Sequence, residues 1–115
     1  GGLATTTAML TEHPDLVTKV VRAMLRATRL IKSDKKYGID FLKGPWLDIG
    51  KDPEKIAART YDMAAPALLE NGTVSEEIQR QMIADAAAQI KPKQPVLPSQ
   101  AFDFSFVQKV SQSLR

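Results

Sequence analysis

Apolar side chains recur every three or four positions over most of the chain, which is the spacing of amphipathic α-helices. The longest run predicts a helix over residues 14–32. Pro14 suits the first helical position, and Asp15 suits the positive end of the helix dipole. The apolar face of this helix comprises Leu16, Val17, Val20, Val21, Met24, Leu25, Ala27, Thr28 and Ile31.

Two shorter helices are predicted in the middle of the chain. Ser33 or Asp34 can cap the first, and Gly44-Pro45 ends it because proline cannot continue the hydrogen-bond ladder. Its apolar contacts are Tyr37, Ile39, Phe41 and Leu42, and an apolar loop with Trp46, Leu47 and Ile49 follows.

Asp52-Pro53-Glu54 is a strong start signal for the next helix. Pro66 should kink or split that helix, and Asn71-Gly72 should stop the segment. The apolar positions with helical spacing are Ile56, Ala57, Thr60, Tyr61, Ala64, Ala67 and Leu68.

The C-terminal third predicts two further helices and a linker between them. One helix starts after Ser75 and ends at Pro92, with apolar positions at Ile78, Met82, Ala86 and Ile90 widened by Ile83 and Ala87. Three prolines within residues 91–99 predict an extended linker with polyproline II character. The last helix begins at Asp103, with Phe102 packing across its start. Its apolar edge is Phe104, Val107, Val110 and Leu114, with Phe106 beside it.

The N-terminal segment Leu3–Leu10 is predicted to be a short strand or extended lead-in, because Thr5, Thr6 and Thr7 are stiff β-branched residues. We therefore expect a mostly α fold, with about five helices and one short N-terminal extended segment, in a single helical domain over residues 1–115. The expected core residues are Leu16, Val20, Met24, Ile56, Tyr61, Ile78, Met82, Phe104 and Val107.

Composition narrows the range of functions. The 115 residues include no cysteine and one histidine, so thiol catalysis, zinc–thiolate sites and disulfides are excluded. No apolar run approaches the roughly 20 residues of a membrane-spanning helix. We find no glycine-rich phosphate loop, no nucleophile elbow and no metal-ligand cluster. The expectation is a protein that is not an enzyme, with no catalytic residues, no metal and no cofactor.

The positive charge is concentrated in one segment. The net charge is +3, yet the segment from Lys19 to Lys36 carries +6, from seven basic residues and one acid. Within the first long helix, basic residues line the side opposite the apolar face. This stripe is either the solvated face of an amphipathic helix or a contact surface for phosphate or an acidic protein. No base-stacking aromatics accompany it, so we expect no nucleic-acid partner. The stripe consists of Lys19, Arg22, Arg26 and Arg29.

Other residues with functional chemistry have simpler structural interpretations. His13 lacks catalytic partners, and its neighbours Glu12 and Asp15 suit capping. Glu76-Glu77 stands in a first helical turn, where acids are favoured. Trp46 and Tyr61 can anchor a core or wall a ligand pocket. The three threonines can bind an anion or simply favour extended backbone.

The order of these signals resembles a known family. An extended Gly-Leu-Ala-Thr-Thr segment precedes Thr-Glu-His-Pro-Asp-Leu-Val (11–17), which leads into a long helix with Arg22-Ala23 and Ala27. Asp52-Pro53, Tyr61, Asn71-Gly72, an acidic helix start, a proline-rich stretch and Phe102-Asp103-Phe104-Ser105 follow. This order is similar to the C-terminal portion of the NMT1/THI5-like periplasmic solute-binding proteins of ABC-type uptake systems. Relatives in that family bind sulfonates, taurine, nitrate or thiamine precursors.

The resemblance implies a fragment of a two-lobed α/β fold that closes on a small molecule. It implies that the helices of this chain clad one lobe, while the sheet, most ligand contacts and an export signal lie earlier in a longer polypeptide. The implied location is periplasmic, and the implied partners are a small-molecule ligand and an ABC permease. Ligand-binding residues in this chain stay unknown. A piece without the rest of its lobe would expose an apolar face through which two copies can dimerise.

A second hypothesis comes from the residues alone. A stand-alone helical module would bind an acidic partner through the basic stripe of the first long helix. The two hypotheses differ in where they place function: in a larger protein that this chain completes, or on one helix face of the chain itself.

Overall fold

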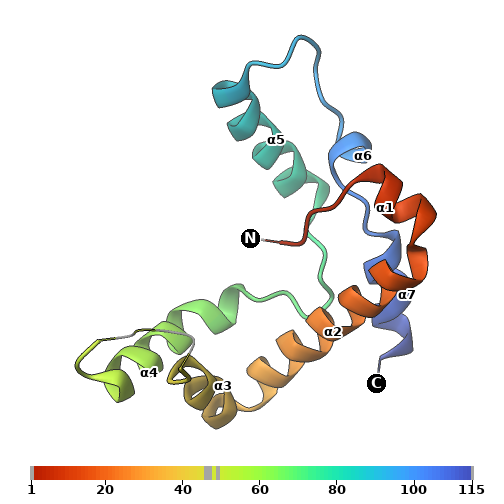
Figure 1. Ribbon diagram of the computed structural model, residues 1–115. Coiled ribbons are helices and arrows are strands. Elements are labelled where there is room, and N and C mark those ends of the chain that lie inside the picture. Colours follow the sequence, from red (N-terminus) through yellow and green to blue (C-terminus); the bar gives the residue numbers. More distant parts are fainter. Residues whose placement is uncertain (1, 46–47, 49, 115) are drawn as a thin grey trace.

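Helices form nearly all of the regular structure. The computed structural model describes residues 2–45, 48 and 50–114 (Figure 1). The mostly α prediction is confirmed, and no strand occurs in those residues, but there are seven α-helices instead of about five. In chain order the elements are α1 (Thr7–Glu12), α2 (Pro14–Ser33), α3 (Lys35–Leu42), α4 (Pro53–Ala64), the 3₁₀-helix η1 (Ala65–Ala67), α5 (Glu76–Ile90), α6 (Pro98–Ala101) and α7 (Ser105–Ser113).

The strand predicted over Leu3–Leu10 is wrong, because α1 begins at Thr7. Thr6 keeps extended backbone (φ −92°, ψ 156°), and its hydroxyl oxygen accepts a hydrogen bond from the Met9 amide at 3.1 Å. A threonine in this position caps a helix and satisfies one of its free amides. Local capping therefore outweighs the general preference of threonine for extended structure.

The main core lies where α2 crosses α7. Val21, Leu25 and Val110 are buried, and Val110 is only 1% exposed. Val17, Phe106, Val107 and Leu114 pack around them. The last helix thus covers the side of α2 that carries Val21 and Leu25.

A second packed unit joins α3 to α4. Asp34 caps α3 by accepting from the Tyr37 amide at 2.9 Å, and Asp52 caps α4 by accepting from the Lys55 amide at 3.3 Å. Buried Tyr61 donates its hydroxyl proton to the Ile31 carbonyl at 2.6 Å, which ties α4 to the end of α2. A β-carbon at Gly38 would come within 2.4 Å of the Tyr61 ring, so only glycine permits this close approach.

Pro66 interrupts the helix, as predicted from its position inside the apolar repeat. The α-helix stops at Ala64 and continues as the 3₁₀ turn η1, so the regular helix ends well before Asn71-Gly72. Gly72 instead takes a positive φ of 69° in the connection to α5. The predicted apolar loop with Trp46, Leu47 and Ile49 lies outside the described residues.

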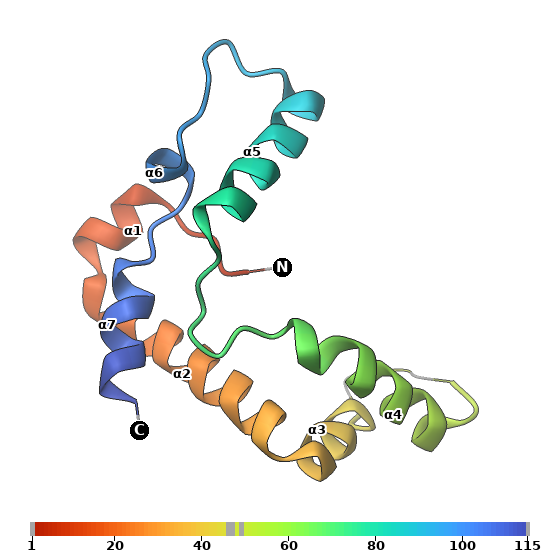
Figure 2. The same cartoon turned by 180° about the vertical axis from the view of Figure 1, so that it is seen from behind.

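The segment after α4 forms an arm of α5 and α6. Ser75 caps α5 by accepting from the Ile78 amide at 3.3 Å. Among the described helices α5 packs only against α6, which was not predicted and begins at Pro98, inside the expected 91–99 linker. Figures 1 and 2 show α5 extending from the centre of the molecule in a different direction from α3 and α4.

The overall shape is open. The radius of gyration is 16.9 Å, whereas a compact chain of this length has a value of about 13 Å. The accessible surface is 9023 Å², against about 6,200 Å² for a typical folded monomer of 12.7 kDa. The chain therefore exposes roughly 2,800 Å² more than a compact monomer would.

Most of the residues predicted to form the core are exposed, because the fold is open. Of the nine expected residues, Tyr61 alone is buried, and Phe104 and Val107 are half-buried. The other six are exposed, between 40% and 52%, because no element of the described structure covers their side of the helix. They are Leu16, Val20, Met24, Ile56, Ile78 and Met82.

Candidate functional site

The predicted basic stripe on α2 is largely used inside the molecule. Arg29 donates to the Glu70 and Leu114 carbonyls and to the Ser111 hydroxyl, at 3.3, 3.2 and 2.9 Å. Arg22 donates to the Ser113 hydroxyl at 3.2 Å. These arginines hold the C-terminal end of α7 against α2, so they are not a purely solvated face.

Lys32 extends this arrangement to the connection after η1. It donates to the Leu68 carbonyl at 2.8 Å and lies 3.8 Å from the Glu70 carboxylate. Lys19 and Arg26 are the exposed remainder of the stripe, and neither makes an ion pair or side-chain hydrogen bond within the described residues. Of the four basic residues in the stripe, only Lys19 and Arg26 therefore remain for an acidic partner.

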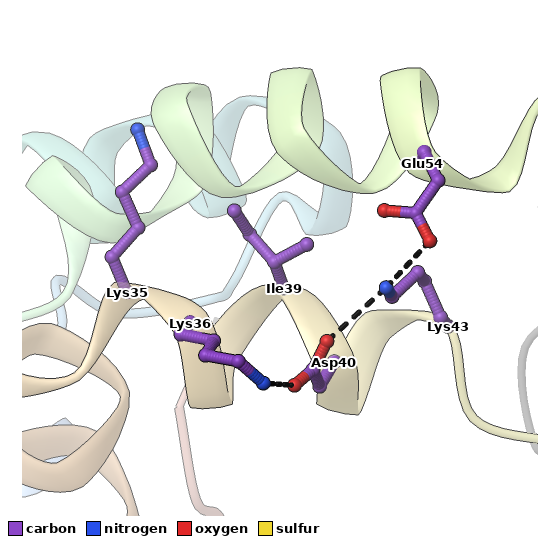
Figure 3. A pocket seen from close by; sticks show the side chains of 6 residues that line it. All are labelled: Lys35, Lys36, Ile39, Asp40, Lys43 and Glu54. Atoms are coloured by element: carbon purple, nitrogen blue, oxygen red, sulfur yellow. Dashed lines mark hydrogen bonds and ion pairs between the residues drawn. The ribbon is translucent and has the colours of Figure 1, made fainter.

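A pocket with a volume of about 540 Å³ lies between α3 and α4 (Figure 3). A chain of ion pairs crosses it. Lys36 and Lys43 bind Asp40 at 2.7 and 3.1 Å, and Lys43 also binds Glu54 at 2.7 Å. The lining residues are Lys35, Lys36, Ile39, Asp40, Lys43 and Glu54.

The charges of this pocket compensate one another. The hydrogen bond from Lys36 lowers the pKa of Asp40 and raises the pKa of Lys36, and the hydrogen bond to Glu54 raises the pKa of Lys43. Lys35 is paired outside the pocket with Asp62 at 2.6 Å. All three lysines therefore have carboxylate partners, and no net charge is left to attract an ionic ligand. The (i, i+4) spacing of Lys36 and Asp40 was readable in the sequence, whereas the contact of Lys43 with Glu54 across two helices was not.

The remaining candidates have structural roles. His13 is exposed at the junction of α1 and α2. Glu76 is paired with Arg80 one turn along α5. Thr6 is a helix cap, and Tyr61 is a core residue. No group of three or more potential metal ligands occurs in the described part of the chain.

The most prominent surface feature is a pair of exposed apolar stripes. On α2, Val20 and Val21 point about 100° apart around the helix axis. α7 covers the Val21 side and leaves the Val20 side open. The α2 stripe is made of Leu16, Val20, Ala23, Met24, Ala27 and Leu30, all exposed.

The α5 stripe repeats this pattern on the arm. Ile83 and Ala87 face the proline-rich return segment, where they line a shallow groove with Pro92, Pro95 and Val96. The adjoining side of α5 is exposed. The α5 stripe is made of Ile78, Met82, Ala86 and Ile90, and Ile90 is 76% exposed.

Comparisons with known proteins assign no role to the two stripes. No family model, no curated protein and no solved structure matches the chain. Within the described residues, every helix is too short or too polar to cross a membrane.

Proposed function

We propose that this chain is the C-terminal helical part of a solute-binding protein that serves ABC-type uptake of a small molecule. In this role its helices clad one lobe of a two-lobed α/β fold outside the cytoplasm, and they perform no catalysis. The ligand class is that of sulfonates, nitrate or thiamine precursors, bound by residues earlier in the longer polypeptide, which then docks on an ABC permease.

One observation carries the proposal: the two long helices expose apolar stripes that no part of the described chain covers. Isolated helices of about 15 residues are marginal in water, and packing of the apolar face supplies most helix stability in proteins. The α2 and α5 stripes are therefore suited to lie against another layer of structure. The excess surface of roughly 2,800 Å² supports this, because the helices of a domain bury their apolar faces against a second layer.

The α2 stripe is suited to close packing on such a layer. Ala23 and Ala27 alternate with larger residues on one side of the helix, and small side chains let a neighbouring backbone approach closely. The resemblance in the order of sequence signals indicates what that layer is, namely the sheet of a binding-protein lobe.

The contacts of the basic stripe favour this proposal over a stand-alone interaction module. Arg22, Arg29 and Lys32 hold α7 and residues 68–70 against α2. Releasing them for an acidic partner would cost these internal bonds.

The test uses a longer polypeptide that carries this sequence at its C-terminal end. Calorimetric titration with taurine and other sulfonates, nitrate and aromatic carboxylates should show binding of one class by the longer protein. A longer protein that is folded and binds none of them would contradict the proposal.

A pair of variants tests the cladding role separately. Val20→Asp should destabilise the longer protein strongly, because it would bury an unpaired charge under the α2 stripe. Gln108→Asp, on an exposed position of α7, is the matched control and should leave the melting temperature nearly unchanged. Equal melting temperatures for the two variants would show that no layer covers the stripe.

A further inference from the structure

The α2 and α5 stripes also have a consequence for the 115-residue chain by itself. We propose that two copies of this chain associate reciprocally, with the α5 stripe of each copy packed on the α2 stripe of the other. This inference goes beyond the proposed function, because it concerns the chain without the layer that the longer polypeptide would supply.

The exposed area is sufficient for such a dimer. A standard protein–protein interface takes about 800 Å² from each partner. The chain exposes roughly 2,800 Å² more than a compact monomer of its mass. Each copy contributes two apolar stripes, so a two-fold arrangement covers all four at once.

Charge selects α5 as the partner of α2. α2 contains five basic residues and one acid, for a net charge of +4, whereas α5 contains three acids and one arginine, for a net charge of −2. Pairing α2 with α2 would bring like charges together, as would pairing α5 with α5. Pairing α2 with α5 brings opposite charges together, which favours that register and speeds encounter.

The edges of the stripes agree with this choice. Lys19 and Arg26 border the α2 stripe and have no partner within the described residues. Asp85 lies about 20° from Ile78 around the helix axis, at the border of the α5 stripe, and Glu77 lies about 100° from Ile78 on the same side. Asp85 accepts a hydrogen bond from the Gln81 side chain at Oδ1, at 2.8 Å, which leaves its Oδ2 and the Glu77 carboxylate for the cations of the other copy.

The first experiment measures the molar mass of the 115-residue chain by light scattering during size-exclusion chromatography. We expect a dimer whose dissociation constant rises with salt concentration. Val20→Lys and Met82→Glu should each give a monomer with an unchanged helical circular dichroism spectrum, since both residues are about half exposed in a single copy, at 45% and 49%. Gln108→Lys and Gln108→Glu are the controls and should stay dimeric.

The second experiment mixes the two monomeric variants. In the reciprocal arrangement, one interface of the mixed pair carries the new lysine against the new glutamate, and the other interface is unchanged. The mixture should therefore regain a dimer that contains one copy of each variant. A monomeric unmodified chain, a dimer insensitive to either variant, or a mixture that stays monomeric would each overturn the proposal. None of these outcomes bears on ligand binding by the longer polypeptide, so failure here is distinguishable from failure of the proposed function.

Discussion

Helices α2 and α5 are alike in their apolar spacing but differ in their surroundings. Both have start signals, and both repeat apolar residues at four-residue intervals. Among the described elements, α2 contacts α1, α3, η1 and α7, whereas α5 contacts only the short α6. The comparison teaches that periodicity identifies a face that can be buried, while burial depends on whether a second element reaches that face.

The same contrast exists within α2, and it gives the largest predicted effect. Val21 is 8% exposed and packs against α7, whereas its neighbour Val20 is 45% exposed. Val21→Asp should cost about 3 kcal/mol or more, because it buries an unpaired charge in the main core. Val20→Asp should cost less than about 1 kcal/mol in the single copy, because the carboxylate stays in water.

Urea unfolding followed by circular dichroism measures both variants. The sequence placed Val20 in the core, whereas the structure places Val21 there and leaves Val20 exposed. A larger loss for Val20→Asp than for Val21→Asp would reverse our assignment of the two sides of α2.

A smaller effect distinguishes the arm from helices α2, α3 and α4, which pack together. Ser75→Ala removes the α5 cap, and Asp34→Ala removes the α3 cap, each at a cost of about 1 kcal/mol. Because α5 packs so little against other helices, the stability lost in the Ser75→Ala variant should appear only as faster hydrogen exchange of the α5 amides. The Asp34 variant should speed exchange in α2 and α4 as well, because α3 packs against both.

Native-state hydrogen exchange at a protein concentration below that of association makes this measurement. The amides of α5 should exchange much faster than those of α2 in the unmodified chain. Equal protection of the two helices would mean that α5 is covered by a contact that the described residues do not make.

The smallest predicted effect is pH dependence at the start of α7. Asp103 accepts hydrogen bonds from the Ser105 hydroxyl and amide at 2.6 and 2.9 Å, and these bonds lower its pKa below the ordinary 3.8. A carboxyl with a lowered folded-state pKa stabilises the fold above its unfolded pKa, and that stabilisation is lost as the pH falls through the folded-state value.

Melting temperatures between pH 3 and 7 test this linkage. Asp103→Asn should melt lower than the unmodified chain at pH 7, and the difference should shrink below about pH 4. Glu12→Gln at the end of α1 is the control and should leave the main transition unchanged, because the Glu12 side chain is exposed and makes no ion pair or side-chain hydrogen bond within the described residues. A difference for Asp103→Asn that is constant across this range would exclude the carboxylate as its source.

The sequence was most informative where signals were local. Asp34, Asp52 and Ser75 act as caps at the predicted helix starts, and Pro66 interrupts α4 as expected. The threonine segment failed because Thr6 has two local options, extended structure or capping, and β-propensity describes only the first. α6 was missed because a four-residue helix has too few positions to show a period.

The role of the basic stripe was beyond sequence reasoning. Arg29 is 41 residues from Glu70 and 85 residues from Leu114 along the chain. The spacing of α2 shows that Arg29 lies opposite the apolar residues, but nothing local indicates that the end of α7 returns to it.

The sequence by itself determined that the chain is helical, where most helices begin and end, and which faces are apolar, because caps, prolines and periodicity act over a few residues. Only the tertiary structure decided which half of each apolar face is buried, since that depends on segments distant in sequence meeting in space. The α2 side with Val21 and Leu25 is covered because α7 returns to it. The α2 and α5 stripes stay open because no part of the described chain reaches them.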